Sequence, residues 1–392
     1  MQIAKTRVVP TPARSATPVA LRCTPEDEAS ANFRSALVSL GKKVNETEDM
    51  TAELCLPLQT APVSGVLPAA QPRVQWLEGG LELPASFALE SGEMLPNASL
   101  AWSCIGPAGA PLIIVLGGIS AHRRVCARDG RGWWEEQCGA GKALDIERYR
   151  LLGIDWLGGC DASTGPRRGD PGRFPEISTL DQARAILLLL NRLGVRRVHL
   201  VVGASYGGNV AQHLAALLGE RLQRLVLLSA AHRPAQFGLA LRHVQRAILD
   251  LGSDRAEALA LARSLAVLGY RTPESLEQRF GGELAPRDAD GVVGWIDHHG
   301  EKFAHRFDAE AYRCLGRSLD THAIDPAAVA APTTLFAVRE DLTVPLSLLR
   351  EYASLARACD LVEIDSVYGH DAFLKEEGAV AALLQQVLEK IQ

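Results

Sequence analysis

The sequence predicts an α/β fold with a mostly parallel central sheet, helices on both faces of the sheet and an inserted helical cap. Three observations lead to this prediction. Short apolar segments suited to buried parallel strands alternate with helical patterns along the chain. A glycine-rich turn at residues 203–208 joins one of these strands directly to a helix. Residues 231–328 contain helical patterns but no convincing strand, so they fit a cap inserted between two core strands.

Residues 1–75 differ from the rest of the chain. They are rich in Pro, Ala, Ser and Thr and have little apolar periodicity, which is typical of a flexible extension. The first residues are partly basic but lack a continuous apolar core, so they do not fit a secretory signal. No acidic residue precedes Glu26, which leaves a transit peptide open. Residues 25–44 fit one amphipathic helix within the extension.

The core is expected in two segments, residues 76–230 and 329–392, on either side of the cap. Alternating segments at 86–89 and 99–102 predict an antiparallel hairpin at the sheet edge. Further strands are predicted at 112–116, 150–155, 198–202, 222–229, 333–338 and 361–364, and helices at 180–193, 241–251 and 255–268. Ligands bind at the carboxyl ends of the strands in such sheets, so the cap is expected to cover the site.

The turn after the strand at 198–202 has the G-x-S-x-G pattern, with Ser205 at its apex. A strand that reverses sharply into a helix brings two backbones together, so a Cβ at Gly203 or Gly207 would clash. The serine also lies at a helix N-terminus, where unpaired N–H groups can stabilise an oxyanion. Because a strand precedes the motif and a helix follows it, the motif indicates the nucleophile elbow of an α/β-hydrolase fold, with Ser205 as the nucleophile.

A serine hydroxyl needs a base, and the base needs an acid that orients it. In this fold the chain order is serine, acid, histidine. His370 follows the last predicted strand and is the expected base, whereas His322 lies in the cap and is interpreted as structural. Asp341 follows the strand at 333–338 and is the expected acid, with the adjacent Glu340 as its rival. Such a triad predicts acyl transfer through an acyl-serine, to water or to another nucleophile.

A second glycine-rich turn, at residues 117–120, follows the strand at 112–116. Two glycines at this place let backbone N–H groups turn toward a ligand, and the α/β-hydrolase fold takes its other oxyanion donor from here. A plain turn from strand to loop is the alternative, and the elbow at Ser205 favours the oxyanion loop.

The composition excludes several classes of function. The 392 residues carry a net charge of −5, which gives no case for binding nucleic acid or an acidic membrane. No apolar run reaches the ~20 residues that a membrane span needs. The eight cysteines are scattered and never form C-x-x-C, which is typical of reduced cysteines in a cytoplasmic protein and not of a disulfide framework or a zinc site. No metal site is expected.

Many short motifs in one order resemble a single family, the homoserine O-acyltransferases of the α/β-hydrolase superfamily. The resemblance runs from about residue 100 to residue 375 and leaves out the N-terminal extension. Its motifs are Gly117-Gly118-Ile119-Ser120, Gly132-Trp133-Trp134, residues 139–145, Leu157-Gly158-Gly159-Cys160, residues 163–166, Phe174-Pro175, the elbow, Tyr270-Arg271-Thr272, Arg306-Phe307-Asp308 and residues 368–374.

The resemblance implies a ping-pong reaction, in which the elbow serine takes an acyl group from acyl-CoA and passes it to the hydroxyl of L-homoserine. The backbone amides of Ile119 and Tyr206 would hold the oxyanion. Arg246 matches a cap-helix arginine that holds the amino acid's carboxylate, Asp371 would take its ammonium group, and Ser120 is grouped with them as substrate-binding. The resemblance also implies a homodimer joined through cap helices, with an acyl-CoA as co-substrate and no permanently bound cofactor.

Departures from the common pattern bear on the acyl donor. The segment after Arg246 is short, and residues 117–123 and 230–233 differ from the form usual in the acetyltransferases. These features are closer to the succinyl-CoA-using branch, which implies a homoserine O-succinyltransferase of methionine biosynthesis. A succinyl carboxylate needs a nearby cation, and the candidates are Arg123, Arg124, Arg167, Arg233 and Arg242.

Other functions stay open at this point. Acetyl-CoA is the alternative donor, and L-serine is an alternative acceptor, since one methylene in a pocket is worth only ~1–3 kcal/mol. A serine esterase would send the acyl group to water and would have no need of Arg246 or Asp371. A non-catalytic binding member of the fold is disfavoured by the intact triad residues.

Overall fold

The computed structural model describes residues 73–166, 173–282 and 291–391, which all belong to one compact unit. The predicted flexible extension, residues 1–75, and its helix at 25–44 therefore lie outside the described residues, apart from residues 73–75. Val74 begins the first strand, so the end of the predicted extension belongs to the sheet.

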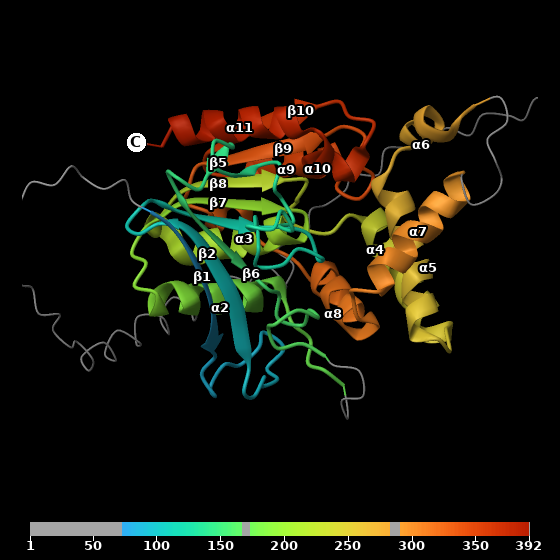
Figure 1. Cartoon of the computed structure of the whole chain (residues 1–392), viewed down its shortest axis with the longest axis horizontal. Coiled ribbons are helices and arrows are strands. Elements are labelled where there is room, and N and C mark those ends of the chain that lie inside the picture. Colours follow the sequence, from blue (N-terminus) through green and yellow to red (C-terminus); the bar gives the residue numbers. More distant parts are fainter. Residues whose placement is uncertain (1–72, 167–172, 283–290, 392) are drawn as a thin grey trace, which may run out of the picture. The chain divides into compact units, whose positions relative to one another are not determined.

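Eight strands form the central sheet: β1 Val74–Glu82, β2 Ser99–Pro107, β3 Leu112–Leu116, β6 Arg150–Ile154, β7 Val198–Ala204, β8 Leu222–Leu228, β9 Thr333–Val338 and β10 Cys359–Ile364. Their order across the sheet is β1-β2-β6-β3-β7-β8-β9-β10 (Figure 1). β2 pairs antiparallel with β1 and β6, whereas all the other neighbours are parallel. Two short strands, β4 Cys138–Gly139 and β5 Leu144–Asp145, form a separate pair. The predicted fold class is confirmed.

Helices cover both faces of this sheet. Successive strand residues point to opposite faces, so Ile113 and Ile114 of β3 belong to two different hydrophobic clusters. Helices α2 Thr179–Arg192, α3 Tyr206–Leu218 and α9 Leu346–Leu355 contribute to the cluster of Ile114, and α11 Glu377–Glu389 contributes to that of Ile113. The remaining short core helices are η2 Gly219–Arg221, η3 Pro326–Ala328, η4 Gly369–Asp371 and α10 Ala372–Lys375. None of the helices in the described ranges has the length and apolarity to cross a bilayer.

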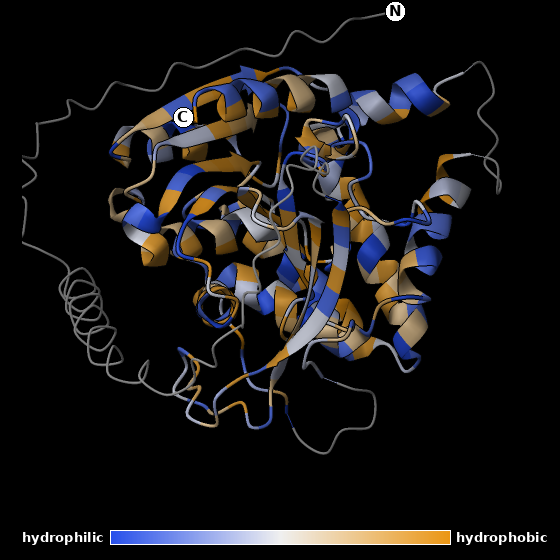
Figure 2. Cartoon of the chain, turned by 60° about the vertical axis from the view of Figure 1, so that its left-hand side comes forward, coloured by the Kyte–Doolittle hydropathy of each residue, from blue (hydrophilic) through white to orange (hydrophobic). Residues whose placement is uncertain are grey.

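The cap lies between β8 and β9 in the chain. Its described part contains α4 Gln236–Leu251, α5 Arg255–Tyr270, α6 Pro273–Phe280, α7 Val292–Ala304 and α8 Ala309–Asp320, and no strand. Leu249, Leu259 and Phe303 belong to a small apolar core of its own. The arrows of β7 and β8 point toward these helices (Figure 1), and the cap helices carry both hydrophobic and hydrophilic residues (Figure 2). The cap therefore stands at the edge of the sheet where ligands bind.

The sheet edge shows one wrong prediction. The hairpin partner of β2 is β1, and residues 86–89 form only an isolated bridge between Ala88 and Met94. β1 has a mostly exposed edge position and two adjacent glycines, so it lacks the apolar alternation by which a strand is recognised. Gly79 is required there, because a Cβ at this residue would lie 2.7 Å from the ring of Trp102 on β2.

Candidate active site

The nucleophile elbow lies between β7 and α3. Ser205 is the connecting residue, with φ of 50° and ψ of −119°. A non-glycine residue in such a conformation is strained by about 1–3 kcal/mol and persists only where the surrounding structure holds it. The predicted close approach is present, because a Cβ built on Gly203 would lie 2.5 Å from the carbonyl oxygen of Gly207. The turn therefore fixes the Ser205 side chain at the carboxyl end of β7.

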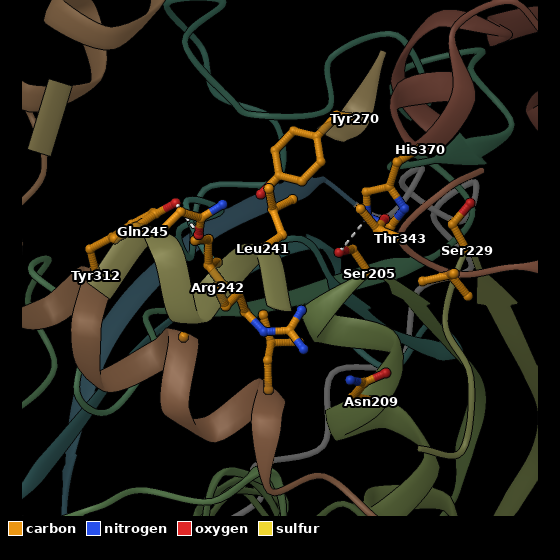
Figure 3. Close-up of a pocket in the computed structure, with 14 residues that line it drawn as sticks. Ser205, Asn209, Ser229, Leu241, Arg242, Gln245, Tyr270, Tyr312, Thr343 and His370 are labelled. Atoms are coloured by element: carbon orange, nitrogen blue, oxygen red, sulfur yellow. Dashed lines mark hydrogen bonds between the residues drawn. The ribbon is translucent and has the colours of Figure 1, made fainter. Parts of the chain in front are cut away.

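Ser205, His370 and Asp341 form one hydrogen-bonded row. The Ser205 hydroxyl lies 2.8 Å from His370 Nε2 (Figure 3), and His370 Nδ1 lies 2.6 Å from Asp341 Oδ2. We assign the Nδ1–H tautomer, in which the ring donates to the carboxylate and accepts from the hydroxyl. The three residues follow β7, β9 and β10, whose carboxyl ends lie at one edge of the sheet. The structure thus brings together the three residues that the sequence predicted.

The structure also separates Asp341 from its rival. Asp341 is buried, and its second oxygen, Oδ1, accepts hydrogen bonds from Thr343 N and Oγ1 at 2.9 Å and from Val344 N at 2.8 Å. Glu340 points elsewhere, because its Oε2 accepts from Ser366 N at 2.8 Å. Asp341, and not Glu340, is therefore the carboxylate in contact with the histidine ring.

His322 lies within the core, as the structural interpretation of this histidine requires. Its side chain is buried, with Nδ1 2.9 Å from Thr179 Oγ1, and its ring packs edge-on against His213 at 5.2 Å. Burial holds the pKa of His322 well below its usual range. A neutral ring with these neighbours has a packing role and is not the base of the row.

Opposing effects set the pKa of His370. Burial lowers it, but the charge of Asp341, the hydrogen bond to Asp341 and the nearby charge of Asp371 raise it, so that the pKa lies above the ordinary value. The ring is therefore ready to accept the proton that a serine nucleophile gives up.

We expect kcat/KM for the acyl donor to fall as the pH drops through a value above the ~6.5 of ordinary histidine, because a protonated His370 cannot accept a proton. The same group contributes to stability with the opposite sign. Its raised pKa stabilises the folded state at low pH, and this contribution is lost as the pH rises through the folded pKa. A pH profile of kcat/KM tests the first statement, and an acidic limb at or below the ordinary histidine value would contradict it.

The two predicted oxyanion donors flank the serine. Ile119 stands in the loop after β3 and lines the cavity in front of Ser205. This loop is tied to α3, because Gly207 N donates to Gly117 O at 2.8 Å. Tyr206 is the first residue of α3, so its backbone N–H has no acceptor within the helix. Both residues therefore lie beside the elbow, and the donation of their amides to an oxyanion stays a prediction.

The side chain of Tyr206 forms hydrogen bonds within the protein. It is fully buried, and its hydroxyl contacts Gln182 Nε2 at 3.0 Å and Ser318 Oγ at 2.9 Å. Gln182 lies on α2 and Ser318 on the cap helix α8. The tyrosine thus links the elbow to both the core and the cap.

A cavity opens in front of the row, between the core and cap helices α4, α5 and α8 (Figure 3). Most of its polar groups are neutral, and Arg242 is the one arginine among the described residues that line it. The lining residues are Ile119, Ser205, Asn209, Ser229, Leu241, Arg242, Gln245, Tyr270, Tyr312, Gly316, Leu319, Thr343, Val344 and His370.

The chain resembles known proteins over most of its length. The model of the alpha/beta hydrolase fold family matches residues 111–377. The chain is 40% identical to a homoserine O-succinyltransferase of Xanthomonas campestris, over 74% of this chain and 78% of that protein. It is 34% identical to a homoserine O-acetyltransferase of Symbiobacterium thermophilum, over 78% of this chain and 92% of that protein. The chain belongs to the homoserine O-acyltransferase family.

Solved structures agree with membership of this acyltransferase family. The crystal structure of a homoserine O-acetyltransferase from Staphylococcus aureus has a TM-score of 0.72 and 26% identity, over 81% of this chain and 97% of that chain. Esterase E22 has a TM-score of 0.71 at 19% identity, which shows the shared fold alone. The names of the homoserine O-acyltransferase relatives include both acyl donors, so family membership leaves the donor open.

The residues that the family resemblance assigns to the amino acid lie just outside the lining of the cavity. Arg246 Nη2 lies 2.7 Å from Asp320 Oδ2, and its Nη1 is buried with no hydrogen-bond partner among the described residues. A Cβ built on Gly316, which lines the cavity, would lie 4.0 Å from this nitrogen. Asp371 Oδ2 lies 2.9 Å from Arg271 Nε.

Other polar residues differ in their position relative to the cavity. Ser120 follows Ile119 in the loop and is not among the described lining residues. Asn209, Ser229 and Gln245 line the cavity but were not singled out from sequence, since neutral polar residues in helices and at strand ends give no local signal. No group of three or more metal-ligating side chains occurs in the part of the chain that the structure describes.

Proposed function

We propose that this protein is a homoserine O-succinyltransferase, which transfers a succinyl group from succinyl-CoA to the hydroxyl of L-homoserine in methionine biosynthesis. The observation that carries the proposal is the hydrogen-bonded row of Ser205, His370 and Asp341 facing a cavity that contains an arginine. The 40% identity to a homoserine O-succinyltransferase supports the choice of donor.

In the first half-reaction, Ser205 Oγ attacks the thioester carbonyl carbon and its proton moves to His370 Nε2. Asp341 stabilises the imidazolium ion that forms, and the amides of Ile119 and Tyr206 donate to the oxyanion. The C–S bond then breaks, and the CoA sulfur takes the proton from His370. An ester between the acyl group and Ser205 remains.

In the second half-reaction, the hydroxyl of L-homoserine takes the place of the thioester. His370 Nε2 accepts its proton while its oxygen attacks the ester carbonyl, and the same two amides hold the oxyanion. The bond to Ser205 Oγ breaks, and His370 returns the proton to the serine. Because water would react in the same way, the acceptor must be held in place before attack.

Three charged or polar residues are proposed to hold the amino acid. Arg246 would reach its carboxylate past Gly316 with the buried Nη1, and a guanidinium suits a carboxylate. Asp371, next to His370, would take the ammonium group by exchanging its present partner Arg271. Ser120 in the oxyanion loop completes the proposed substrate-binding set.

Several finer points of this proposal remain predictions. Acetyl-CoA as donor and L-serine as acceptor use the same triad, and a serine esterase would need the triad alone. The homodimer, the cytoplasmic location and the lack of a permanently bound cofactor also stay predictions.

The release of free CoA thiol by purified protein tests the proposal. We expect rapid release from succinyl-CoA that depends on L-homoserine, with slower release when acetyl-CoA or L-serine replaces either substrate. Reactions without an acceptor measure hydrolysis. Activity on simple esters with no dependence on any amino acid would overturn the transferase and leave a hydrolase.

A further inference from the structure

We infer that Arg242 binds the terminal carboxylate of the succinyl group and thereby selects the acyl donor. This inference rests on the proposed function. A succinyl group differs from an acetyl group by a carboxylate, and moving a carboxylate from water into a largely closed cavity is costly unless a cation receives it. The cavity must therefore offer a cation for the donor, separate from the groups that hold the amino acid.

The structure describes four of the five candidate arginines, and Arg167 lies outside the described residues. Arg123 pairs with the buried Asp155 at 2.5 Å, and Arg124 and Arg233 pair with Glu78 and Glu351. None of these three is among the described lining residues of the cavity. Arg242, alone of the four described candidates, lines the cavity that contains Ser205 and His370 (Figure 3).

Among the described residues, the ion pairs around Arg242 contain one more positive charge than negative charges. Arg242 Nε donates to Asp320 Oδ1 at 2.5 Å, and the other oxygen of Asp320, Oδ2, lies 2.7 Å from Arg246 Nη2. Two guanidinium groups thus share one carboxylate, and all three side chains are at most 19% exposed. A partly buried cluster with a net positive charge attracts an anion, and Arg242 is the member of this cluster that lines the cavity.

The bond between Arg242 and Asp320 also leaves the paired donors of the guanidinium out of that contact. Its bond to Asp320 uses Nε, so the end of the group, with Nη1 and Nη2, can meet a carboxylate through two parallel hydrogen bonds. This end lies near the start of α4, where a Cβ on Gly238 would lie 3.1 Å from Nη1. A Cβ on Gly238 would also lie 3.5 Å from the carbonyl oxygen of Thr343, which lines the cavity.

Ser229 gives independent evidence that the cavity takes a polar ligand. It lines the same cavity, is fully buried, and its hydroxyl has no hydrogen-bond partner among the described residues. Its φ of 49° is held in the left-handed region at the end of β8. A buried hydroxyl without a hydrogen-bond partner destabilises the protein. We therefore expect the Ser229 hydroxyl to form a hydrogen bond with an oxygen of the bound ligand, directly or through a water molecule.

Donor selectivity of Arg242 variants tests this inference. We expect Arg242→Gln to lower kcat/KM for succinyl-CoA by about 100-fold, as for a lost ion pair with a desolvated carboxylate, and to change kcat/KM for acetyl-CoA by less than about 3-fold. Arg242→Lys keeps the positive charge but loses the two parallel donors of the guanidinium. Its kcat/KM for succinyl-CoA should lie between the values of the wild type and Arg242→Gln. Arg350→Gln removes an exposed arginine of α9 that pairs with Glu363, and should leave both values unchanged.

Each outcome of this experiment decides one question. An equal loss with both donors, together with a higher KM for L-homoserine, would assign Arg242 to the amino acid and overturn the inference. Unchanged use of succinyl-CoA by Arg242→Gln would overturn it as well. The wild-type assay comes first, because a protein without amino-acid-dependent CoA release fails the proposed function whatever Arg242 does. If Arg242→Gln does not fold, as judged by circular dichroism, Arg242→Lys provides the test. The inference then requires that its ratio of kcat/KM for succinyl-CoA to kcat/KM for acetyl-CoA be lower than that of the wild type.

Discussion

Ser205→Ala is expected to reduce CoA release by at least about 10⁴-fold, the usual effect of removing the nucleophile of a triad. The reason lies in the elbow, which holds the Ser205 hydroxyl 2.8 Å from the only ring nitrogen that can take its proton. Alanine removes the atom that becomes acylated, and no neighbouring group stands in its place in the row. The fold should survive, since the change deletes one oxygen at a cavity surface.

A covalent intermediate separates this mechanism from direct transfer. With succinyl-CoA and no acceptor, the wild-type protein should gain the mass of one succinyl group on the peptide that carries Ser205. Ser354→Ala is the control, because Ser354 lies on α9, its exposed hydroxyl donates to Glu351 O, and it is not among the described lining residues of the cavity. Ser354→Ala should keep the label, and Ser205→Ala should lose it. A label on another residue, or full activity of Ser205→Ala, would overturn the assignment.

The sequence was most informative where the chemistry depends on local geometry. The elbow requires a glycine two residues before and two residues after the serine, because two backbones meet there, and this requirement can be read directly from residues 203–207. His370 and Asp341 could be placed because each follows an apolar strand, and parallel strands end at one edge of the sheet. The sheet edge was harder, because β1 is mostly exposed and has no apolar alternation.

The substrate cavity was less accessible to sequence reasoning. Arg242 and Arg246 are one helical turn apart on α4, so periodicity places both on one face and cannot tell which reaches the cavity. The difference depends on α8, whose Asp320 contacts both guanidinium groups and whose Gly316 lies near Arg246 Nη1. The pairing of Asp371 with Arg271 likewise depends on how the cap meets the core. Such contacts follow from tertiary packing and leave no local pattern.

Asp341→Asn is expected to lower kcat by about 10⁴-fold, whereas Glu340→Gln should change it by less than about 3-fold. The hydrogen bonds of Asp341 give the reason. Two backbone N–H groups, from Thr343 and Val344, donate to Oδ1, so the asparagine oxygen must take that side. Its NH₂ group then faces His370 Nδ1 and forces that nitrogen to accept. The proton moves to Nε2, and the ring can no longer accept a proton from Ser205.

The two variants form a pair that tests position as well as chemistry. Both replace a carboxylate by an amide of the same shape, in adjacent residues, and both keep hydrogen bonds to a backbone N–H. Both variants lose one negative charge, so the loss of charge cannot make their activities differ. Contact with His370 can, because Asp341 lies 2.6 Å from Nδ1 of the ring and Glu340 does not. Raising the pH should not restore Asp341→Asn, since its defect is the wrong tautomer and not a protonated ring. An equal loss in Glu340→Gln, or recovery of Asp341→Asn at high pH, would show that the acid acts through its charge and not by orienting the histidine.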